Sequence, residues 1–474
     1  MENRKKNTVQ NHAAKPEKSL ENRPSPEDNA PSQLDARTKI VNILTRVETQ
    51  HAYTDKLLDK EITEFGAEDR GLITEVVNGV LRWQYRLDWY LSQLYVGAYN
   101  NLIPDVKNNL RSSAYQLMYL DRVPAYAVLN EAVEIAKNKF NQKTANLVNA
   151  ILRNLLRQQK KLEYLEMKLE YLERLSVSYS HPLWLVRRWI EQWGIDDTVA
   201  LCQSNNRRPR ISIRINHLKI EPTAFFSILD ENQVEYEQHP DFSEYVWIDN
   251  FSEFRKLDLM KKGAAIVQDI STGLPVRLLA PRPGETVLDM CAAPGGKTAF
   301  IGEMMNDNGR LMALEKHHSR AKMLSDNLQR QGISIAGVIT ADATKIPSRL
   351  RFDKILLDAP CSGLGVLNKR VDLRWKRTLN DIDAMTKLQL KLLKSAASVL
   401  NENGSIVYST CTIETAENEN VIRQFLSENS QFKLYKIGQE IPLQFCWDKN
   451  TIRTFPHRHQ MDGSFAVRLR KQSH

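Results

Sequence analysis

Two cysteines end apolar runs of the sequence and are the residues best suited to covalent chemistry. Cys361 follows Asp358 and a proline in ILLDAPCSG, and Cys411 ends VYSTC. A thiolate is a strong nucleophile, but it needs exposure and a positive environment to form near neutral pH. One cysteine at a strand end is usually a buried small side chain. Two at strand ends of one sheet indicate a reactive role, and the residues alone leave open which cysteine attacks.

A loop of small residues follows another apolar run, TVLDM, and reads CAAPGGKT. A P-loop, GxxxxGK followed by Ser or Thr, would need glycine where Cys291 stands, and the dinucleotide fingerprint GxGxxG is absent. The remaining interpretation is a loop for S-adenosylmethionine, because small residues let the backbone pass close to a ligand. The expected cofactor-binding residues in this loop are Cys291, Ala292, Ala293, Pro294, Gly295, Gly296 and Lys297.

Acidic residues follow the next two apolar runs. Glu315 ends LMALE, and Asp342 follows VIT. A carboxylate at the first position can accept both hydroxyls of a ribose, and the second could receive a donor from adenine. Each acid alone is more often a helix cap or a solvated group. Together, after successive strands, they predict the rest of a cofactor trough.

Strands and helices must alternate to position these residues. TVLDM, GRLMALE, DKILLDAP and GSIVYST have the character of buried parallel strands, and amphipathic segments separate them. The pattern predicts a doubly wound, Rossmann-like α/β domain over residues 269–474. Such sheets bind ligands at the carboxyl ends of their strands, where all of the residues above stand.

The rest of the chain divides into three parts. Residues 1–35 have few large apolar side chains and predict a disordered tail. Residues 36–175 show helical periodicity without strand-like alternation and predict an all-α domain. Residues 176–268 suggest strand, helix and strand, a small α+β, RRM-like unit. Its arginines are either a solvated basic edge or contacts for an RNA backbone: Arg207, Arg208, Arg210 and Arg214.

The composition limits the class of protein. A chain of 474 residues is too long for one core, and 42% hydrophobic with 26% charged residues is typical of globular proteins. The sequence has no apolar run near ~20 residues and no secretory signal, so we expect a cytoplasmic protein without a membrane partner. The five cysteines form no CxxC pair, which argues against disulfides and a metal site. The net charge of +9 favours a polyanionic partner.

The motifs CAAPGGKT, LDAPCSG and STC, in this order, resemble those of the RNA 5-methylcytosine methyltransferases. The helical region, with VNAILRN, is similar to the NusB-like domain of the bacterial enzymes of the RsmB/Sun/Fmu type, which methylate small-subunit ribosomal RNA. The resemblance covers nearly everything after the tail. It implies a cytosine-C5 methyltransferase with S-adenosylmethionine as cofactor and small-subunit ribosomal RNA as partner. We also expect a monomer without a metal.

The resemblance implies roles for three residues. The nucleophile of the RNA family is the cysteine of its Thr-Cys pair, here Cys411, which would add to C6 of cytosine and activate C5. Cys361 is then implied to assist product release. Asp358 is implied to lie beside the cytosine, against N3 or the exocyclic amine, and near the methyl donor, so that it also belongs to the cofactor-binding residues. A DNA cytosine methyltransferase would instead use the Pro-Cys cysteine, Cys361. That alternative stays open, as does a noncatalytic, NusB-like RNA-binding or antitermination factor.

The segment VDLRWKR follows the Pro-Cys loop and has two interpretations. Its aromatic and basic residues, with the preceding arginine, are candidates for stacking on bases and for binding phosphate. The alternative is a packed tryptophan among solvated basic residues. The residues concerned are Arg370, Arg374, Trp375 and Lys376.

Overall fold

The computed structural model describes residues 33–50 and 52–472. The tail expected over residues 1–35 therefore lies outside the described residues, except for its last three positions. Those three begin the first helix. None of the helices in the described ranges is long and apolar enough to cross a bilayer.

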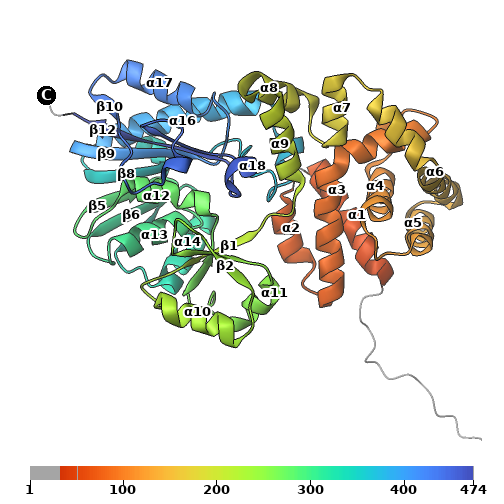
Figure 1. The fold of residues 1–474 in the computed structure, drawn as a ribbon, viewed down its shortest axis with the longest axis horizontal. Helices are drawn as coiled ribbons and strands as arrows, with labels where there is room; N and C mark the ends of the chain where they lie inside the picture. The colour runs from red at the N-terminus through yellow and green to blue at the C-terminus, as the bar shows by residue number, and fades with distance from the viewer. Residues whose placement is uncertain (1–32, 51, 473–474) are drawn as a thin grey trace, which may run out of the picture.

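The N-terminal domain is a bundle of helices, on the right in Figure 1. Its apolar residues recur at helical spacing, so that Ile73, Val76 and Val80 lie on one face and are buried in the bundle core. The predicted all-α fold is confirmed. The helices are α1 (Gln33–Gln50), α2 (Thr54–Glu61), α3 (Ala67–Leu94), α4 (Pro104–Tyr119), α5 (Ala125–Lys139), α6 (Gln142–Met167) and α7 (Tyr171–Ser178).

Two further helices, α8 (Leu183–Trp193) and α9 (Ile195–Asn206), lie between this bundle and the rest of the molecule (Figure 1). Trp189 of α8 is fully buried. It belongs to a hydrophobic cluster that includes Leu367 and Phe455 of the C-terminal domain. Helix α8 therefore packs against the C-terminal domain.

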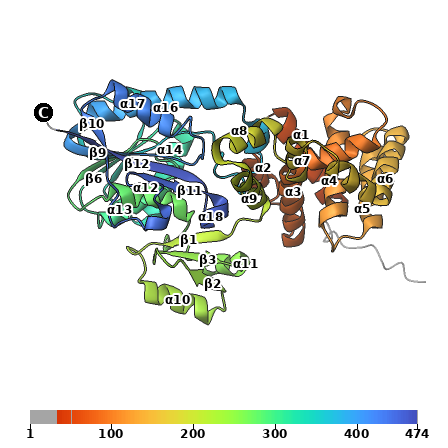
Figure 2. The ribbon, with the colours of Figure 1, turned by 45° about the horizontal axis from the view of Figure 1, so that its top comes forward.

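A small antiparallel sheet follows, with strand order β2-β3-β1-β4 (Figure 2). The predicted α+β class is confirmed, but two strands were missed because each has only three residues. Arg214 is neither solvated nor free for RNA, since it is fully buried and pairs with Glu303. The elements are β1 (Ile211–Ile215), α10 (Pro222–Glu231), β2 (Tyr236–Gln238), β3 (Tyr245–Ile248), α11 (Phe251–Phe254) and β4 (Ala265–Val267).

The C-terminal domain is built on an eight-stranded sheet, with order β10-β12-β9-β8-β5-β6-β7 and β11 paired to β12. The five strands from β9 to β7 are parallel, as predicted. The three last strands of the chain are antiparallel additions that the sequence reading did not include. The strands are β5 (Thr286–Asp289), β6 (Arg310–Glu315), β7 (Ala336–Thr340), β8 (Phe352–Asp358), β9 (Leu400–Thr410), β10 (Phe432–Tyr435), β11 (Thr451–Thr454) and β12 (Ser464–Lys471).

Helices cover both faces of this sheet (Figure 2). One face packs against α16 (Leu379–Val399) and α17 (Glu419–Glu428), the other against α12 (Leu274–Leu279) and α13 (Gly296–Met304). Strand order reverses between β5 and β8: the chain runs outward from β5 to β6 and β7, then returns to β8 and continues to β9. A crevice opens at such a reversal, outside the carboxyl ends of the strands, so this is where the fold places a ligand.

The segment after the Pro-Cys loop joins the C-terminal domain to the helical bundle. Arg374 is fully buried. Its guanidinium donates to the carbonyl oxygens of Arg82, Ser180 and Asn205 at 3.1 Å each. Burial lowers the pKa of Arg374 to about 9, and the positive charge of Arg82 acts in the same direction.

Its two neighbours make the same kind of contact. Trp375 Nε1 donates to the carbonyl oxygen of Leu81 at 2.6 Å, and Lys376 Nζ donates to that of Ala52 at 2.7 Å. Trp375 is packed, as one interpretation expected, but Arg374 and Lys376 are not solvated as that interpretation required. Burial and remote carbonyl partners leave none of the three free to contact RNA.

Candidate active site

The small-residue loop connects β5 to α13 at the reversal of strand order. Gly295 has φ of +109° and comes directly before the helix, a backbone conformation that glycine adopts without strain. A side chain on Gly296 would meet the Gln268 carboxamide at 3.5 Å. The loop therefore brings bare backbone and the N-terminus of a helix to the floor of a cavity.

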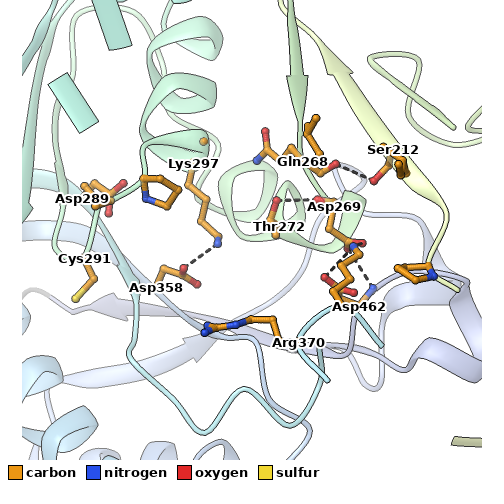
Figure 3. Close-up of a pocket in the computed structure, with 18 of the residues that line it drawn as sticks. Ser212, Gln268, Asp269, Thr272, Asp289, Cys291, Lys297, Asp358, Arg370 and Asp462 are labelled. Carbon is orange, nitrogen blue, oxygen red and sulfur yellow. Dashed lines mark hydrogen bonds and ion pairs between the residues drawn. The ribbon is translucent and has the colours of Figure 1, made fainter. Parts of the chain in front are cut away.

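That cavity has a volume of about 640 Å³ and begins at this loop (Figure 3). It continues past Lys297 and Asp358 and ends beside Lys369 and Asp462. In Figure 3, Asp358 lies between Cys291 at one side and Asp462 at the other. Burial raises the pKa of Cys291, so this thiol is not a reactive one.

Asp358 stands at the centre of the cavity with both carboxylate oxygens engaged. Lys297 Nζ donates to Oδ2 at 2.7 Å, and Ser409 Oγ donates to Oδ1 at 2.8 Å. Although burial opposes the charge of Lys297, Asp358 raises the pKa of this ammonium group, and the charge of Cys411 contributes in the same direction. The ion pair between Lys297 and Asp358 thus lies where we expect the methyl donor and the cytosine to meet.

The two cysteines lie together immediately beside this ion pair. Their Sγ atoms are 3.2 Å apart, although neither side chain lines the cavity itself. Cys411 is exposed and Cys361 is half-buried. The hydrogen bond with Cys411, followed by burial, raises the pKa of Cys361 well above its usual range. Cys361 therefore keeps its proton and can donate it in a hydrogen bond to the other sulfur.

A buried carboxyl group holds the Pro-Cys loop in place. Glu417 is fully buried and accepts the Ser362 backbone N–H at 2.8 Å and Gln389 Nε2 at 2.9 Å. Gln389 Nε2 also donates to the Pro360 carbonyl oxygen at 2.9 Å. Burial raises the pKa of Glu417. The residues on both sides of Cys361 are therefore fixed by two side chains that the sequence reading did not single out.

Glu315 and Asp342, the two acidic residues expected to bind the ribose and the adenine, lie outside this cavity. Glu315, at the end of β6, is buried and accepts the His317 backbone N–H at 2.9 Å. Asp342 accepts the Thr344 backbone N–H at 3.0 Å and pairs with Lys316 at 3.0 Å. Neither residue lines the described cavity. Glu315 ends β6, the neighbour of β5, and Asp342 follows β7, the next strand outward.

Comparisons with known proteins agree with this architecture. The family model described as 16S rRNA methyltransferase RsmB/F matches residues 276–470, the NusB family model matches 34–157, and a ferredoxin-like domain of RsmF/B-like methyltransferases matches 181–254. A probable ribosomal RNA small subunit methyltransferase B from Bacillus subtilis is 32% identical over 438 residues, 90% of this chain and 97% of the relative. The chain belongs to the RsmB/F family of methyltransferases.

Other relatives extend the agreement over the whole chain. A ribosomal RNA small subunit methyltransferase B from Escherichia coli is 30% identical over 93% of this chain and 99% of its own. The crystal structure of PH0851 superposes with a TM-score of 0.78 at 29% identity, over 93% of this chain and 99% of that one. A methyltransferase homologue from Pyrococcus horikoshii covers 64% of this chain and all of its own, with a TM-score of 0.56 and 28% identity. The predicted family and fold class are confirmed.

The cofactor of this RsmB/F protein is S-adenosylmethionine, and the cavity has groups to match its amino-acid end. Asp289 Oδ1 and Gln268 Nε2 are buried atoms without a hydrogen-bond partner in the described part of the chain, and both residues line the cavity. One is an acceptor and the other a donor, which suits an ammonium and a carboxylate group. Burial raises the pKa of Asp289 to about 6. The residues present therefore fit the cofactor.

The sequence reading missed Asp289 and Gln268, although signals for both were present. Asp289 stands in VLDM at the end of the same strand that leads to the CAAPGGKT loop. A carboxyl group at the end of an otherwise apolar strand is unusual enough to mark a ligand contact. Gln268 precedes the domain in sequence, and only the fold brings it against Gly296.

Proposed function

We propose that this RsmB/F protein transfers a methyl group from S-adenosylmethionine to C5 of a cytosine in small-subunit ribosomal RNA, with Cys411 as the nucleophile. The observation that carries the proposal is the 3.2 Å contact between the two thiols beside Asp358. Cytosine C5 is a poor nucleophile, and a thiolate that adds to C6 makes C5 reactive. Cys411 is the exposed sulfur of the pair, so it is the one that an incoming base can reach.

The cofactor supplies the electrophilic methyl group. The Cys411 thiolate would form a bond to C6, and the electrons of the C5–C6 double bond would form the new bond from C5 to the methyl carbon. The bond between that carbon and the sulfonium sulfur would break at the same time, and its electrons would stay on the sulfur. A base then takes the C5 proton, the double bond re-forms, and the bond between sulfur and C6 breaks. Asp358 holds N3 or the exocyclic amine of the ring, and the Lys297 ammonium stabilises negative charge at the centre of the site.

Cys361 assists the release of the product in this mechanism. Its raised pKa keeps the proton on its sulfur, so it can donate a hydrogen bond to the Cys411 thiolate as that thiolate leaves C6. A better-stabilised leaving thiolate departs faster. The same protonation argues against the DNA cytosine methyltransferase alternative, in which Cys361 would itself have to ionise and attack.

The proposal assigns the remaining predicted residues as well. The loop from Cys291 to Lys297 would hold the cofactor, together with Glu315 and Asp342 for its nucleoside end. The domains would be divided as expected, into residues 36–175, 176–268 and 269–474, with the first two binding folded RNA around the catalytic domain. We further infer that the protein acts as a cytoplasmic monomer. Its complete arrangement of cofactor cavity and thiol pair favours an enzyme over a noncatalytic RNA-binding factor.

A denaturing gel that resolves covalent protein–RNA adducts tests the roles of the cysteines. Parent protein, Cys361→Ala and Cys411→Ala are each incubated with S-adenosylmethionine and small-subunit ribosomal RNA that lacks its modifications. We expect Cys361→Ala to accumulate an adduct, since attack works and release fails. Cys411→Ala should give neither adduct nor methyl transfer.

Cys446→Ala is the matched control, because Cys446 lies away from the thiol pair and should behave as the parent does. The reverse pattern, with an adduct only in Cys411→Ala, would make Cys361 the nucleophile. If neither the parent nor any variant methylates or traps the RNA, the proposed activity is wrong and the noncatalytic factor becomes the better reading.

A further inference from the structure

A second charged cluster lines the end of the cavity that is remote from the cofactor loop. Lys369 pairs with Asp269 and, at 3.0 Å, with Asp462. Asp269 follows β4, Lys369 follows the Pro-Cys loop, and Asp462 precedes β12, so three separate segments converge here. The mechanism above uses none of these residues.

The cluster contains one ammonium group and two carboxyl groups. One carboxyl oxygen accepts no hydrogen bond from the described residues. Asp462 is only 5% exposed, yet its Oδ1 has no hydrogen-bond partner among the described residues. Leaving a buried polar atom without a partner is costly, so a purely structural ion pair would not need this second acid. Because Asp462 lines the cavity, its free oxygen is available to a bound ligand.

The charge of the cluster selects the kind of ligand. Although burial opposes it, Lys369 lowers the pKa of Asp269, which keeps that carboxylate ionised. Burial raises the pKa of Asp462 to about 7, with the charge of Asp269 acting in the same direction. The single ammonium group is already paired with two carboxyl groups, so the cluster has no excess positive charge to hold an anion. A hydroxyl group fits it in either protonation state of Asp462, because a hydroxyl both donates and accepts.

The position of the cluster identifies which hydroxyl it meets. With the C4 edge of cytosine at Asp358 and C5 toward the cofactor loop, the ribose on N1 lies on the side of the ring away from both. Figure 3 shows Asp462 on that side of Asp358, and Lys369 and Arg370 line the same end of the cavity. Within an RNA chain the 2′-hydroxyl is the free hydroxyl of the ribose, and it distinguishes RNA from DNA.

We propose that Asp462, held in place by Lys369 and Asp269, binds the 2′-hydroxyl of the cytidine to be methylated and so selects ribonucleotide over deoxyribonucleotide. This inference rests on the proposed function, because it assumes that a cytidine occupies the cavity. A deoxycytidine would leave Asp462 Oδ1 buried without a hydrogen-bond partner. Binding sites discriminate strongly against an analogue that lacks a hydroxyl when a buried polar group is left unpaired in this way.

The test compares two versions of one substrate. The cytosine that the parent methylates is first located in unmodified small-subunit ribosomal RNA. Short RNAs around it are then made with cytidine or 2′-deoxycytidine at that single position, and single-turnover methyl transfer is measured. We expect the parent to prefer cytidine by about 10- to 100-fold, the range for one lost buried hydrogen bond. This comparison needs no variant, so it does not depend on the folding of a mutant.

Variants then assign the preference to the cluster. Asp462→Ala should lower the rate on cytidine to about the rate on deoxycytidine, and Asp462→Asn should retain part of the preference, since an amide can still bond a hydroxyl. Glu285→Gln is the matched control, because it breaks a comparable pair, Lys354 with Glu285 at 3.0 Å, just before β5 at the opposite edge of the sheet. It should leave the preference unchanged.

Different outcomes separate this inference from the proposed function. Equal rates of the parent on both RNAs would overturn the assignment of Asp462 while leaving methyl transfer intact. A fall of both rates by the same factor in Asp462→Ala would overturn it too, since that result indicates a structural role only. If the parent methylates neither RNA and no rRNA, the proposed function itself fails.

Discussion

The thiols of Cys361 and Cys411 lie 3.2 Å apart because two neighbouring parallel strands end side by side. Asp358, the last residue of β8, pairs in register with Ser409 of β9. The Pro-Cys turn then brings Cys361 back over the end of β9. Two thiolates at this distance would repel each other strongly, so at least one of the two sulfurs keeps its proton.

Removal of Cys411 should change the titration of Cys361. In Cys411→Ala we expect the pKa of Cys361 to fall, since the hydrogen bond with Cys411 is the largest cause of its raised value. The measurement is the rate of iodoacetamide modification of each cysteine against pH, read by mass spectrometry. The profile of Cys446, whose pKa is raised mainly by burial, should not move. An unchanged profile for Cys361 would show that the sulfur contact is unimportant.

Lys297→Met should slow methyl transfer. The variant removes the ammonium group that bonds Asp358 at 2.7 Å, so charge at the centre of the site is no longer stabilised. We expect a loss of about 100-fold in the single-turnover rate, the scale for removing one preorganised electrostatic group. Lys345→Met, at an exposed lysine beyond β7, should keep the parent rate. Equal losses in the two variants would contradict a specific role.

Cofactor affinity should depend on pH through Asp289. Burial raises its pKa to about 6 in the free protein, so it becomes neutral as the pH falls below that value. An ammonium group favours the ionised form, so affinity for S-adenosylmethionine should weaken as the pH is lowered from 7 to 5. Asp289→Asn should bind about 10-fold more weakly at pH 7 and lose this dependence. Isothermal titration calorimetry at several pH values checks both statements.

Arg374→Met should destabilise the contact between the domains. It leaves several buried carbonyl oxygens without a donor, including those of Arg82 and Ser180. We expect a loss of about 2–5 kcal/mol in the free energy of unfolding. Thermal unfolding measures the loss, and limited proteolysis should show earlier cleavage between the helical bundle and the catalytic domain. An unaltered melting profile would mean that the interface does not depend on Arg374.

Arg370→Ala should affect RNA binding and not stability, although Arg370 lies only four residues before Arg374. Arg370 is 42% exposed, lines the cavity and stands 5.5 Å from the ring of Tyr53. We expect unchanged stability, weaker binding of ribosomal RNA and a salt dependence reduced by about one unit of slope, as for the loss of one phosphate contact. Filter binding at several salt concentrations tests this. Equal affinity of variant and parent at every salt concentration would exclude a phosphate contact.

Local patterns were enough to predict much of the fold and of the site. The parallel strands were readable as apolar runs, and Cys361, Cys411, Asp358 and Lys297 all stand in motifs at strand ends. Their convergence follows from the rule that carboxyl ends of parallel strands share one edge. Whether each carries its expected role remains a prediction until the cysteine and lysine variants are measured.

Long-range contacts could not be predicted in the same way. Arg374 and Trp375 bond main-chain oxygens nearly three hundred residues earlier in the chain, and nothing in VDLRWKR distinguishes that from a nucleic-acid contact. The three-residue strands β2 and β4 are too short to show alternation. Gln268 reaches the cofactor loop only because the small sheet docks beside it.

The docking of the catalytic domain on the helical bundle has a consequence for evolution. Arg374, Trp375 and Lys376 donate to main-chain carbonyl oxygens of Arg82, Leu81 and Ala52 in the bundle. Every amino acid offers the same carbonyl oxygen, so the bundle can change these side chains and still present the same acceptors. At these three contacts, selection for the hydrogen bond therefore constrains the side chain of the donor and leaves the side chain of the acceptor residue free to change.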